Sequence, residues 1–380
     1  MSARTGLAEV LRTFGPAWLA THALSPPRAK VWRAITSCRT AALGGRVEVC
    51  PDCGLSRHVY LSCRNRHCPL CQTRAKEAWL AARGRECLPV PYFHLVFTLP
   101  HALNALIAQH PRALYEMLFQ VASATLNAFA ADPKHLGGTP AFTLVLHTWK
   151  QDLNRHVHVH ALMAGGALTA NGQWKAAKRG FLFPVRALSK AFRACFMAAL
   201  DGLREQSPEL ADWRTLKRRL FAHDWVVYAK APLGGPQAVL DYLARYTHRV
   251  AISNERILGI ENGQVAFRVR GEAGKRRTLR LPGVEFIDRF LKHVLPEGFK
   301  RIRHYGLLAP AKKTERLALA RVALDAPTPE PAVIESVDAF LRRVAKIEAC
   351  ACPACQGRLR VVAVLAPVRH GSVDARGPPP

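Results

Sequence analysis

Polar and apolar residues alternate strictly in one short segment near the middle of the chain. In RHVHVHALMAGG (155–166), histidines take every second position and small apolar residues fill the gaps. Side chains of a β-strand alternate between its two faces, so the pattern predicts a strand with the histidines on one face and the valines in the core. The apolar run at 137–149 precedes it by a short polar link, which predicts an antiparallel hairpin.

The remaining hydrophobic periodicity predicts helices and further strands. Helical spacing of apolar residues occurs within 1–45, 101–131, 187–220, 236–252 and 285–295. Runs of aromatic and β-branched residues predict strands at 89–100 and 223–233, and a basic hairpin at 264–281. This mixture predicts an α+β protein whose central antiparallel sheet is flanked by helices and carries the histidines on a central strand.

The same features divide the chain into three expected regions. A helical and cysteine-rich domain is expected over 1–88, and a second domain, which holds the sheet, over 89–310. Residues 311–380 read as a basic tail with a Cys-x-x-Cys knuckle and a Pro/Gly-rich, disordered end.

The composition predicts a binding partner and a cellular compartment. The 380 residues include 55 Lys and Arg against 27 Asp and Glu, a formal net charge of +28 spread along the chain. Such an excess is typical of folded proteins that bind a polyanion, and nucleic acid is the expected one. The sequence has neither an apolar run of about 18 residues, the length that a membrane span needs, nor a secretory signal, which predicts a cytoplasmic protein without a membrane partner.

Cysteine spacing predicts structural zinc. The chain has 11 cysteines, and in a reducing compartment their clustering favours metal over disulfides. Two Cys-x-x-Cys knuckles, Cys50 with Cys53 and Cys68 with Cys71, have the spacing of one tetrahedral zinc site.

The loop between these knuckles holds further candidates. The leftover residues His58, Cys63 and His67 are possible ligands of a second zinc ion together with Cys38 or Cys87, or else contacts to DNA. Arg64 and Arg66 would present guanidinium groups to phosphates from a metal-pinned turn. A third knuckle, Cys352 with Cys355, fills only two positions and needs ligands from His370 or elsewhere in the chain.

The alternating histidines predict a second kind of metal site. His158 and His160 can converge on one divalent ion from the same strand face, whereas the alternative is a solvated polar face. A third ligand is expected from the paired strand, with His147 preferred and Gln151 as the alternative.

A tyrosine pair downstream supplies a candidate nucleophile. Tyr242 and Tyr246 lie four residues apart and share a face if 236–252 is a helix, although an amphipathic core helix is the alternative. Tyrosine is a poor nucleophile, and a metal that neutralises charge on a scissile phosphate makes its attack feasible. The product would be a 5′-phosphotyrosine, and the chain has no Walker A sequence. The expected phosphate contacts are Arg245, Arg249, Lys275, Arg276 and Arg277.

Several segments together resemble one known family. The sequences SCRNRHCPLCQ, LPVPYFHLVFTLPHALN, HVHVHALMAGG, DWVVYAKAPLGGP and YLARYTHRVAISNERI, in this order, resemble the rolling-circle transposases of the insertion sequence 91 family. The resemblance implies a zinc-binding domain followed by a two-tyrosine HUH nuclease (His, hydrophobic residue, His). It places the HUH motif on 158–160 and the nucleophiles on Tyr242 and Tyr246. It also implies magnesium or manganese as cofactor and single-stranded transposon ends as the DNA partner in a bacterial cell.

Two other classes of function compete with this interpretation. A non-enzymatic zinc-ribbon regulator that binds nucleic acid would not need the histidines or the tyrosines. A zinc hydrolase of a small molecule would need further ligands after the His-x-His motif, and it would leave the charge of +28 unexplained.

Overall fold

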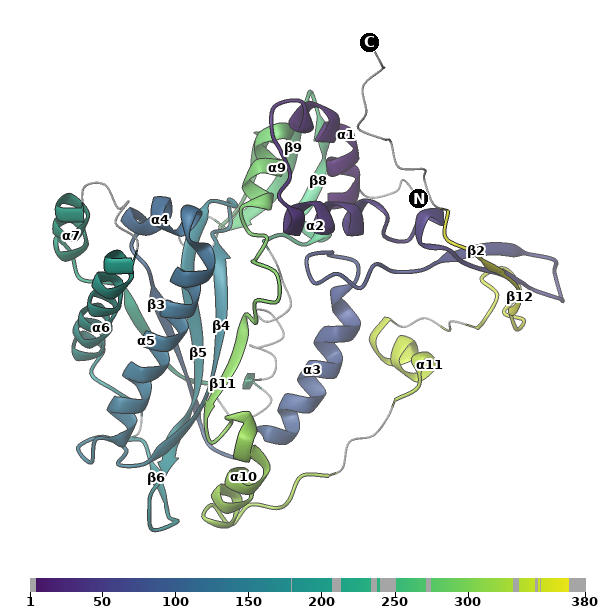
Figure 1. Cartoon of the computed structure of the whole chain (residues 1–380). Helices are drawn as coiled ribbons and strands as arrows, with labels where there is room; N and C mark the ends of the chain where they lie inside the picture. The colour runs from purple at the N-terminus through teal and green to yellow at the C-terminus, as the bar shows by residue number, and fades with distance from the viewer. Residues whose placement is uncertain are drawn as a thin grey trace. The chain divides into compact units, whose positions relative to one another are not determined.

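The protein folds into two compact units. The computed structural model describes residues 5–178, 180–206, 213–233, 238–239, 251–270, 275–330, 335–345, 348 and 350–368. One unit consists of residues 1–72 and 331–380, and the other of residues 73–330. The first unit is therefore discontinuous in sequence, with the second inserted into it (Figure 1).

The first unit combines short helices with a three-stranded antiparallel sheet. Helices α1 (Leu7–Leu19) and α2 (Pro26–Thr36) bury apolar side chains such as Trp18 and Ile35. The sheet has the order β12–β1–β2, formed by β1 (Gly45–Val49), β2 (Ser56–Tyr60) and β12 (Arg360–Leu365). Strands from the beginning and the end of the chain thus lie side by side (Figure 1). The remaining elements are the turn η1 (Ala41–Leu43), α11 (Val337–Phe340) and the π-helical turn η6 (Leu341–Ala345).

A larger antiparallel sheet forms the centre of the second unit. Its strands follow the order β11–β4–β5–β3–β7, with β6 paired to the end of β5. Their bounds are β3 (Tyr92–Thr98), β4 (Thr139–Trp149), β5 (Arg155–Leu168), β6 (Trp174–Ala176), β7 (Val227–Leu233) and β11 (Ile302–Gly306). The histidine strand, β5, is the central one.

Two long helices cover one face of this sheet. Helices α5 (Pro111–Ala131) and α6 (Val185–Gln206) pack on it, and Figure 1 shows both on the same side. Val157, Val159 and Ala161 of β5 are fully buried in this core. Each large side chain buried there, such as Phe97 or Phe192, contributes about 1.5–3 kcal/mol. Shorter helices of this unit are η2 (His101–Leu103), α4 (Asn104–Gln109) and α7 (Trp213–Phe221).

The opposite face of the sheet is covered by a smaller apolar cluster at one end of the strands. Helices α3 (Gln72–Glu86) and α10 (Lys313–Val322), the latter preceded by η5 (Pro310–Lys312), contribute Trp79, Leu80 and Leu317 to it. From β5 the cluster takes Leu162 and Ala164. The histidines lie on this same face but nearer the other end of β5, next to a pocket.

A second, smaller sheet completes this unit. Strands β8 (Ile257–Glu261), β9 (Gln264–Arg270) and β10 (Arg276–Pro282) form an antiparallel meander, preceded by η3 (Asn254–Arg256) and followed by α9 (Gly283–Leu291). Phe267 of β9 packs edge to face against Phe286 of α9, with ring centroids 5.4 Å apart.

The predicted class and most predicted elements agree with the structure. The protein is α+β, and β4 and β5 form the expected antiparallel hairpin. The segment 1–88 is not a domain by itself, because the first unit ends at residue 72 and α3 joins the second. The segment 311–380 is not a separate tail, because α10 belongs to the second unit and β12 pairs with β1. Residues 369–380, predicted to be disordered, lie outside the described residues.

Helix length and apolar character together decide whether a helix can cross a lipid bilayer. Within the described part of the chain, no helix is both long enough and apolar enough to do so.

Candidate metal centres and nucleic-acid interface

Three histidines converge on the hairpin of β4 and β5. The register places His147 directly opposite His158, and His160 follows two residues later on the same face. The Nε2 atoms of His158 and His160 are 3.1 Å apart, and His160 Nε2 is 3.1 Å from His147 Nδ1. One nitrogen from each ring thus lies within 4.8 Å of the other two. Nitrogens about 3 Å apart suit a shared ion with metal–nitrogen bonds of about 2.0–2.1 Å.

Neighbours of the Nδ1 atoms of His158 and His160 determine which ring nitrogen carries the lone pair. His158 Nδ1 lies 2.9 Å from the carbonyl oxygen of His156 and must donate to it, which leaves Nε2 as an acceptor. His160 Nδ1 lies 2.9 Å from Nε2 of the buried His94 on β3. A proton on His160 Nδ1 would again make Nε2 the lone-pair nitrogen that faces the other two rings, as is usual for metal-bound histidine.

The surroundings keep the imidazoles uncharged. Burial, and next the charge of His156, lowers the pKa of His158 to about 4. Burial together with the neighbouring imidazoles lowers the pKa of His160 well below its usual value. Burial and the nearby Lys230 lower the pKa of His94 to about 4. Neutral rings with lone pairs facing one another repel, so the cluster fits a cation bound among them.

The turn that joins β4 to β5 is hydrogen-bonded to η3, to α9 and to the residues just after α9. Its carbonyl oxygens at Gln151, Asp152 and Leu153 accept hydrogen bonds from Arg256, Arg289 and His293, respectively. His293 is fully buried, and its other ring nitrogen lies 3.1 Å from the hydroxyl of Thr148. Because the donors fix three successive carbonyls, the hairpin that carries the histidines is held firmly. Gln151, the alternative third ligand, has an exposed side chain in this turn and lines the adjoining pocket.

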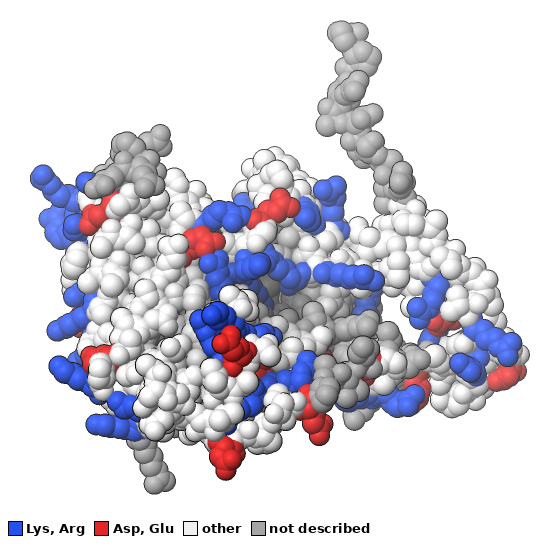
Figure 2. Space-filling view, turned by 60° about the horizontal axis from the view of Figure 1, so that its bottom comes forward, with Lys and Arg blue, Asp and Glu red and all other residues white. Residues whose placement is uncertain are grey.

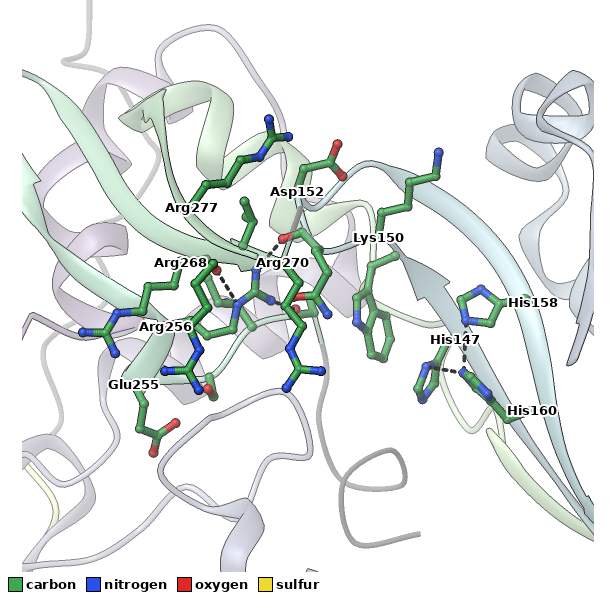
Figure 3. A pocket seen from close by; sticks show the side chains of 17 residues that line it. His147, Lys150, Asp152, His158, His160, Glu255, Arg256, Arg268, Arg270 and Arg277 are labelled. Carbon is green, nitrogen blue, oxygen red and sulfur yellow. Dashed lines mark hydrogen bonds between the residues drawn. The ribbon is translucent and has the colours of Figure 1, made fainter. Parts of the chain in front are cut away.

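An open pocket of about 800 Å³ lies beside the histidines. His147, His158 and His160 stand on one side of it, and arginines of β9 and β10 reach in from the other side (Figure 3). The basic side chains that line it are Lys150, Arg256, Arg268, Arg270, Arg276 and Arg277, against two carboxylates, Asp152 and Glu255. This excess of positive charge beside a metal-type cluster suits a phosphodiester chain.

Only some of the predicted DNA contacts lie among the described residues. Arg276 and Arg277 line the pocket, and Lys275 is exposed next to them. Arg64 and Arg66 are exposed in the loop that follows β2, and Arg64 adopts a left-handed backbone with φ of 52°. Tyr242, Tyr246, Arg245 and Arg249 lie outside the described residues.

Sequence reasoning missed the other arginines of the pocket. Arg268 and Arg270 are exposed on β9, whereas Val269 between them is buried. The alternation in FRVR could have predicted that both arginines lie on the same face of a strand. The approach of Arg256 had no comparable signal, because it depends on the packing of the turn at 150–154.

The cysteines form two clusters, and the predicted grouping of Cys50, Cys53, Cys68 and Cys71 is wrong. Cys68 and Cys71 lie with Cys38 and Cys63, where Cys71 Sγ is 3.4 Å from Cys38 Sγ and 3.6 Å from Cys63 Sγ. Cys50 and Cys53 lie instead with Cys352 and Cys355. A knuckle supplies two ligands and does not specify its partner, so tertiary folding decided the pairing.

The other candidate ligands near these knuckles were Cys63, His58 and His67, and only Cys63 lies in a cluster. Cys63 lies in a cluster with Cys38, in agreement with one of the two alternatives for a second zinc site. His58 is exposed on β2 and stacks near Tyr60, and the ring of His67 lies 3.2 Å from the Asn65 side-chain oxygen. Neither histidine belongs to the four-residue groups found among the described residues.

Basic side chains are spread over the surface. On the face drawn in Figure 2, Lys and Arg are widely distributed and clearly outnumber Asp and Glu. This distribution agrees with the net charge of +28 and with a polyanionic partner.

Comparison with known proteins identifies the class and the family. A family described as "Transposase zinc-binding domain" matches residues 10–99, and one described as "Putative transposase" matches residues 141–316. The chain is 43% identical over 385 residues to "Putative transposase y4qJ" of Sinorhizobium fredii, with 95% of this chain and 96% of that protein covered. It is 28% identical over 311 residues to "Transposase for insertion sequence element IS801" of Pseudomonas savastanoi pv. phaseolicola, covering 78% and 73%.

These relatives place the protein among DNA transposases that carry a zinc-binding domain. The chain belongs to the insertion sequence 91 family of transposases. No solved structure matches it significantly.

Proposed function

We propose that this transposase nicks and rejoins single-stranded DNA through a 5′-phosphotyrosine intermediate during rolling-circle transposition of an insertion sequence. The observation that carries the proposal is the convergence of His147, His158 and His160 at the side of an arginine-lined pocket. Neutral imidazoles suit a divalent ion, and the arginines opposite suit the DNA backbone.

His147, His158 and His160 would hold a magnesium or manganese ion. When bound, the ion would polarise the scissile phosphate and neutralise the charge that develops on it. Nitrogen ligands favour manganese, because magnesium prefers oxygen ligands and dehydrates reluctantly.

Tyr242 and Tyr246 are the proposed nucleophiles, and the described residues on either side support their placement. Val239 is fully buried in the apolar cluster on the histidine face of the sheet, and Ala251 lines the pocket. Tyr242 follows Val239 by three residues, and Tyr246 precedes Ala251 by five. A chain of five residues spans at most about 18 Å, so Tyr246 is tethered within that distance of Ala251 at the pocket, and Tyr242 lies within about 11 Å of Val239.

The proposed cleavage conserves the energy of the phosphodiester bond. The tyrosine oxygen bonds to phosphorus, the bond from phosphorus to the 3′ oxygen breaks, and that oxygen takes a proton to become a free 3′-hydroxyl. The phenolic proton is lost to solvent. Attack by another 3′-hydroxyl reverses these steps and releases the tyrosine, so rejoining needs no nucleotide.

The arginines would bind and orient the strand. Arg268, Arg270 and Arg277 can contact successive phosphates, since phosphate contacts set register without reading sequence. A single strand would bring its backbone close to the histidines because its phosphates are not fixed in a duplex.

Trapping the covalent intermediate tests this proposal. Labelled single-stranded DNA carrying the element's ends is incubated with protein and Mn²⁺, then run on a denaturing gel. We expect a slowly migrating adduct with the wild type and none with Tyr242→Phe/Tyr246→Phe. Tyr228→Phe is the matched control, because Tyr228 is exposed on β7 and outside the proposed machinery.

An adduct that persists in the double variant would show that the nucleophile lies elsewhere. Unchanged transposition by variants of both the tyrosines and the histidines would favour a non-enzymatic zinc-ribbon regulator.

A further inference from the structure

The cluster that contains the C-terminal knuckle is a metal site of its own. Cys50 Sγ is 3.5 Å from Cys355 Sγ, and Cys53 Sγ is 3.6 Å from Cys352 Sγ. All four sulfurs lie within 4.8 Å of one another. Tetrahedral zinc with Zn–S bonds of about 2.3 Å separates its sulfurs by about 3.8 Å, close to these distances. Disulfide sulfurs would lie about 2.05 Å apart.

The two knuckles of this cluster share one backbone geometry. The N–H of Cys50 donates to the carbonyl of Leu55, and the N–H of Cys352 donates to that of Gly357, five residues on in both cases. The residue after the second cysteine donates back to the first cysteine's carbonyl, at 2.9 Å in each knuckle. That residue is left-handed in both, with φ of 73° at Gly54 and 64° at Gln356.

The strands around the knuckles repeat the same arrangement. Val49 pairs with Ser56 across the first knuckle, and Ala351 pairs with Arg358 across the second, with a separation of seven residues each time. CPDCGL and CPACQG therefore form two equivalent halves that face one another. Equivalent knuckles of this kind present their sulfurs toward a common centre.

Packing alone does not account for the position of the C-terminal strand. Val361, Val362 and Val364 of β12 are 56%, 60% and 83% exposed, so β12 buries little apolar surface. The apolar core beside the cluster consists of Cys50, Cys352 and Leu359, with Leu55 packed against it. A sheet with so small a core needs another source of stability, and a structural metal is a common one.

We propose that Cys50, Cys53, Cys352 and Cys355 bind a second structural zinc ion, which closes the first unit by fastening the C-terminal segment to the N-terminal hairpin. The matched zinc-binding family ends at residue 99, so it does not include Cys352 and Cys355. The unit then holds two zinc ions, one in this cluster and one among Cys38, Cys63, Cys68 and Cys71.

Metal content of the full-length protein tests the proposal directly. Elemental analysis should give two zinc ions per wild-type chain and one for Cys352→Ser/Cys355→Ser. Cys350→Ser is the matched control, because Cys350 is exposed in the same segment but outside the group of four, and it should keep two. One zinc per wild-type chain, unchanged in the double variant, would overturn the proposal.

Hydrogen exchange supplies a second readout that does not depend on activity. In Cys352→Ser/Cys355→Ser, amides of β1 (45–49) should exchange at least tenfold faster, while β3 and β5 of the second unit keep their protection. Unchanged protection of β1 would contradict the proposal, even if zinc were lost. Two disulfides in the wild type, seen as a mass four hydrogens lower in the denatured and metal-free protein, would also overturn it.

Discussion

The histidine cluster and the cluster that contains the C-terminal knuckle assemble their ligands over very different distances in the sequence. His147, His158 and His160 come from one hairpin, whose register brings them together locally. Cys50 and Cys53 meet Cys352 and Cys355 across about three hundred residues, and a whole second unit lies between them in sequence. The local site depends on hairpin geometry, whereas the distant one depends on the complete fold of the first unit.

Removal of a cysteine from the Cys38 cluster should have the largest effect. Cys68→Ser should lose one zinc and unfold the first unit, because structural zinc of this type contributes on the order of 10 kcal/mol of binding energy to the local fold. Strands β3, β4 and β5 should stay protected in hydrogen exchange. Loss of protection in both units alike would show that the two regions are not independent.

Removal of two histidines should leave the fold intact and strongly reduce cleavage. His158→Ala/His160→Ala should reduce nicking of single-stranded DNA on the order of 10³-fold, equivalent to about 4 kcal/mol of transition-state stabilisation. DNA affinity should change little, because the proposed phosphate contacts lie elsewhere. His223→Ala, at an exposed site, is the control. Cleavage near the wild-type rate by the double variant, or by wild type in EDTA, would contradict a metal-dependent mechanism.

Substitution of His94 should weaken metal binding without removing a ligand. His94→Phe keeps a ring but loses the nitrogen that faces His160 Nδ1, and loss of such a partner lowers metal affinity about 10–100-fold. The measurement is a Mn²⁺ titration of nicking, in which saturating metal should restore most of the rate. His94→Gln, which keeps an acceptor, should behave more like the wild type. A defect that saturating Mn²⁺ does not relieve would indicate a merely structural role.

Substitution of pocket arginines should have the smallest effect. Arg276→Ala/Arg277→Ala should reduce the magnitude of the log–log salt slope for single-stranded DNA binding by about 0.7 for each phosphate that the variant no longer neutralises. Fluorescence anisotropy at several salt concentrations measures this slope. A slope equal to that of the wild type would place the strand away from this wall of the pocket.

Local patterns predicted the large sheet of the second unit well, because alternation and a short link between strands are visible within a few residues of sequence. Alternation placed Val157 and Val159 in the core and the histidines opposite, and the short link predicted the pairing of His147 with the histidine strand. The same reasoning could not find His94 or Arg256, since their positions beside the site follow from the order of strands and the packing of a turn.

The cysteine assignment failed because a Cys-x-x-Cys knuckle determines only half of a site. Cys50–Cys53 and Cys68–Cys71 are near in sequence, yet the two pairs belong to different clusters. The likeness between CPDC and CPAC was a usable signal that these two knuckles belong together. Strand β12 was missed because its exposed valines resemble a tail, and only its pairing with β1 makes it a strand.

The discontinuous first unit makes the chain topologically a closed ring. Covalent bonds run from β1 through the whole second unit to β12, and the ladder between β12 and β1 closes the circuit. A single proteolytic cut near residue 73 or near residue 330 would therefore open the ring without releasing either unit. Two cuts are needed to set the second unit free, whereas one cut divides the protein into two pieces only if the β1–β12 ladder and the cysteine cluster beside it also separate.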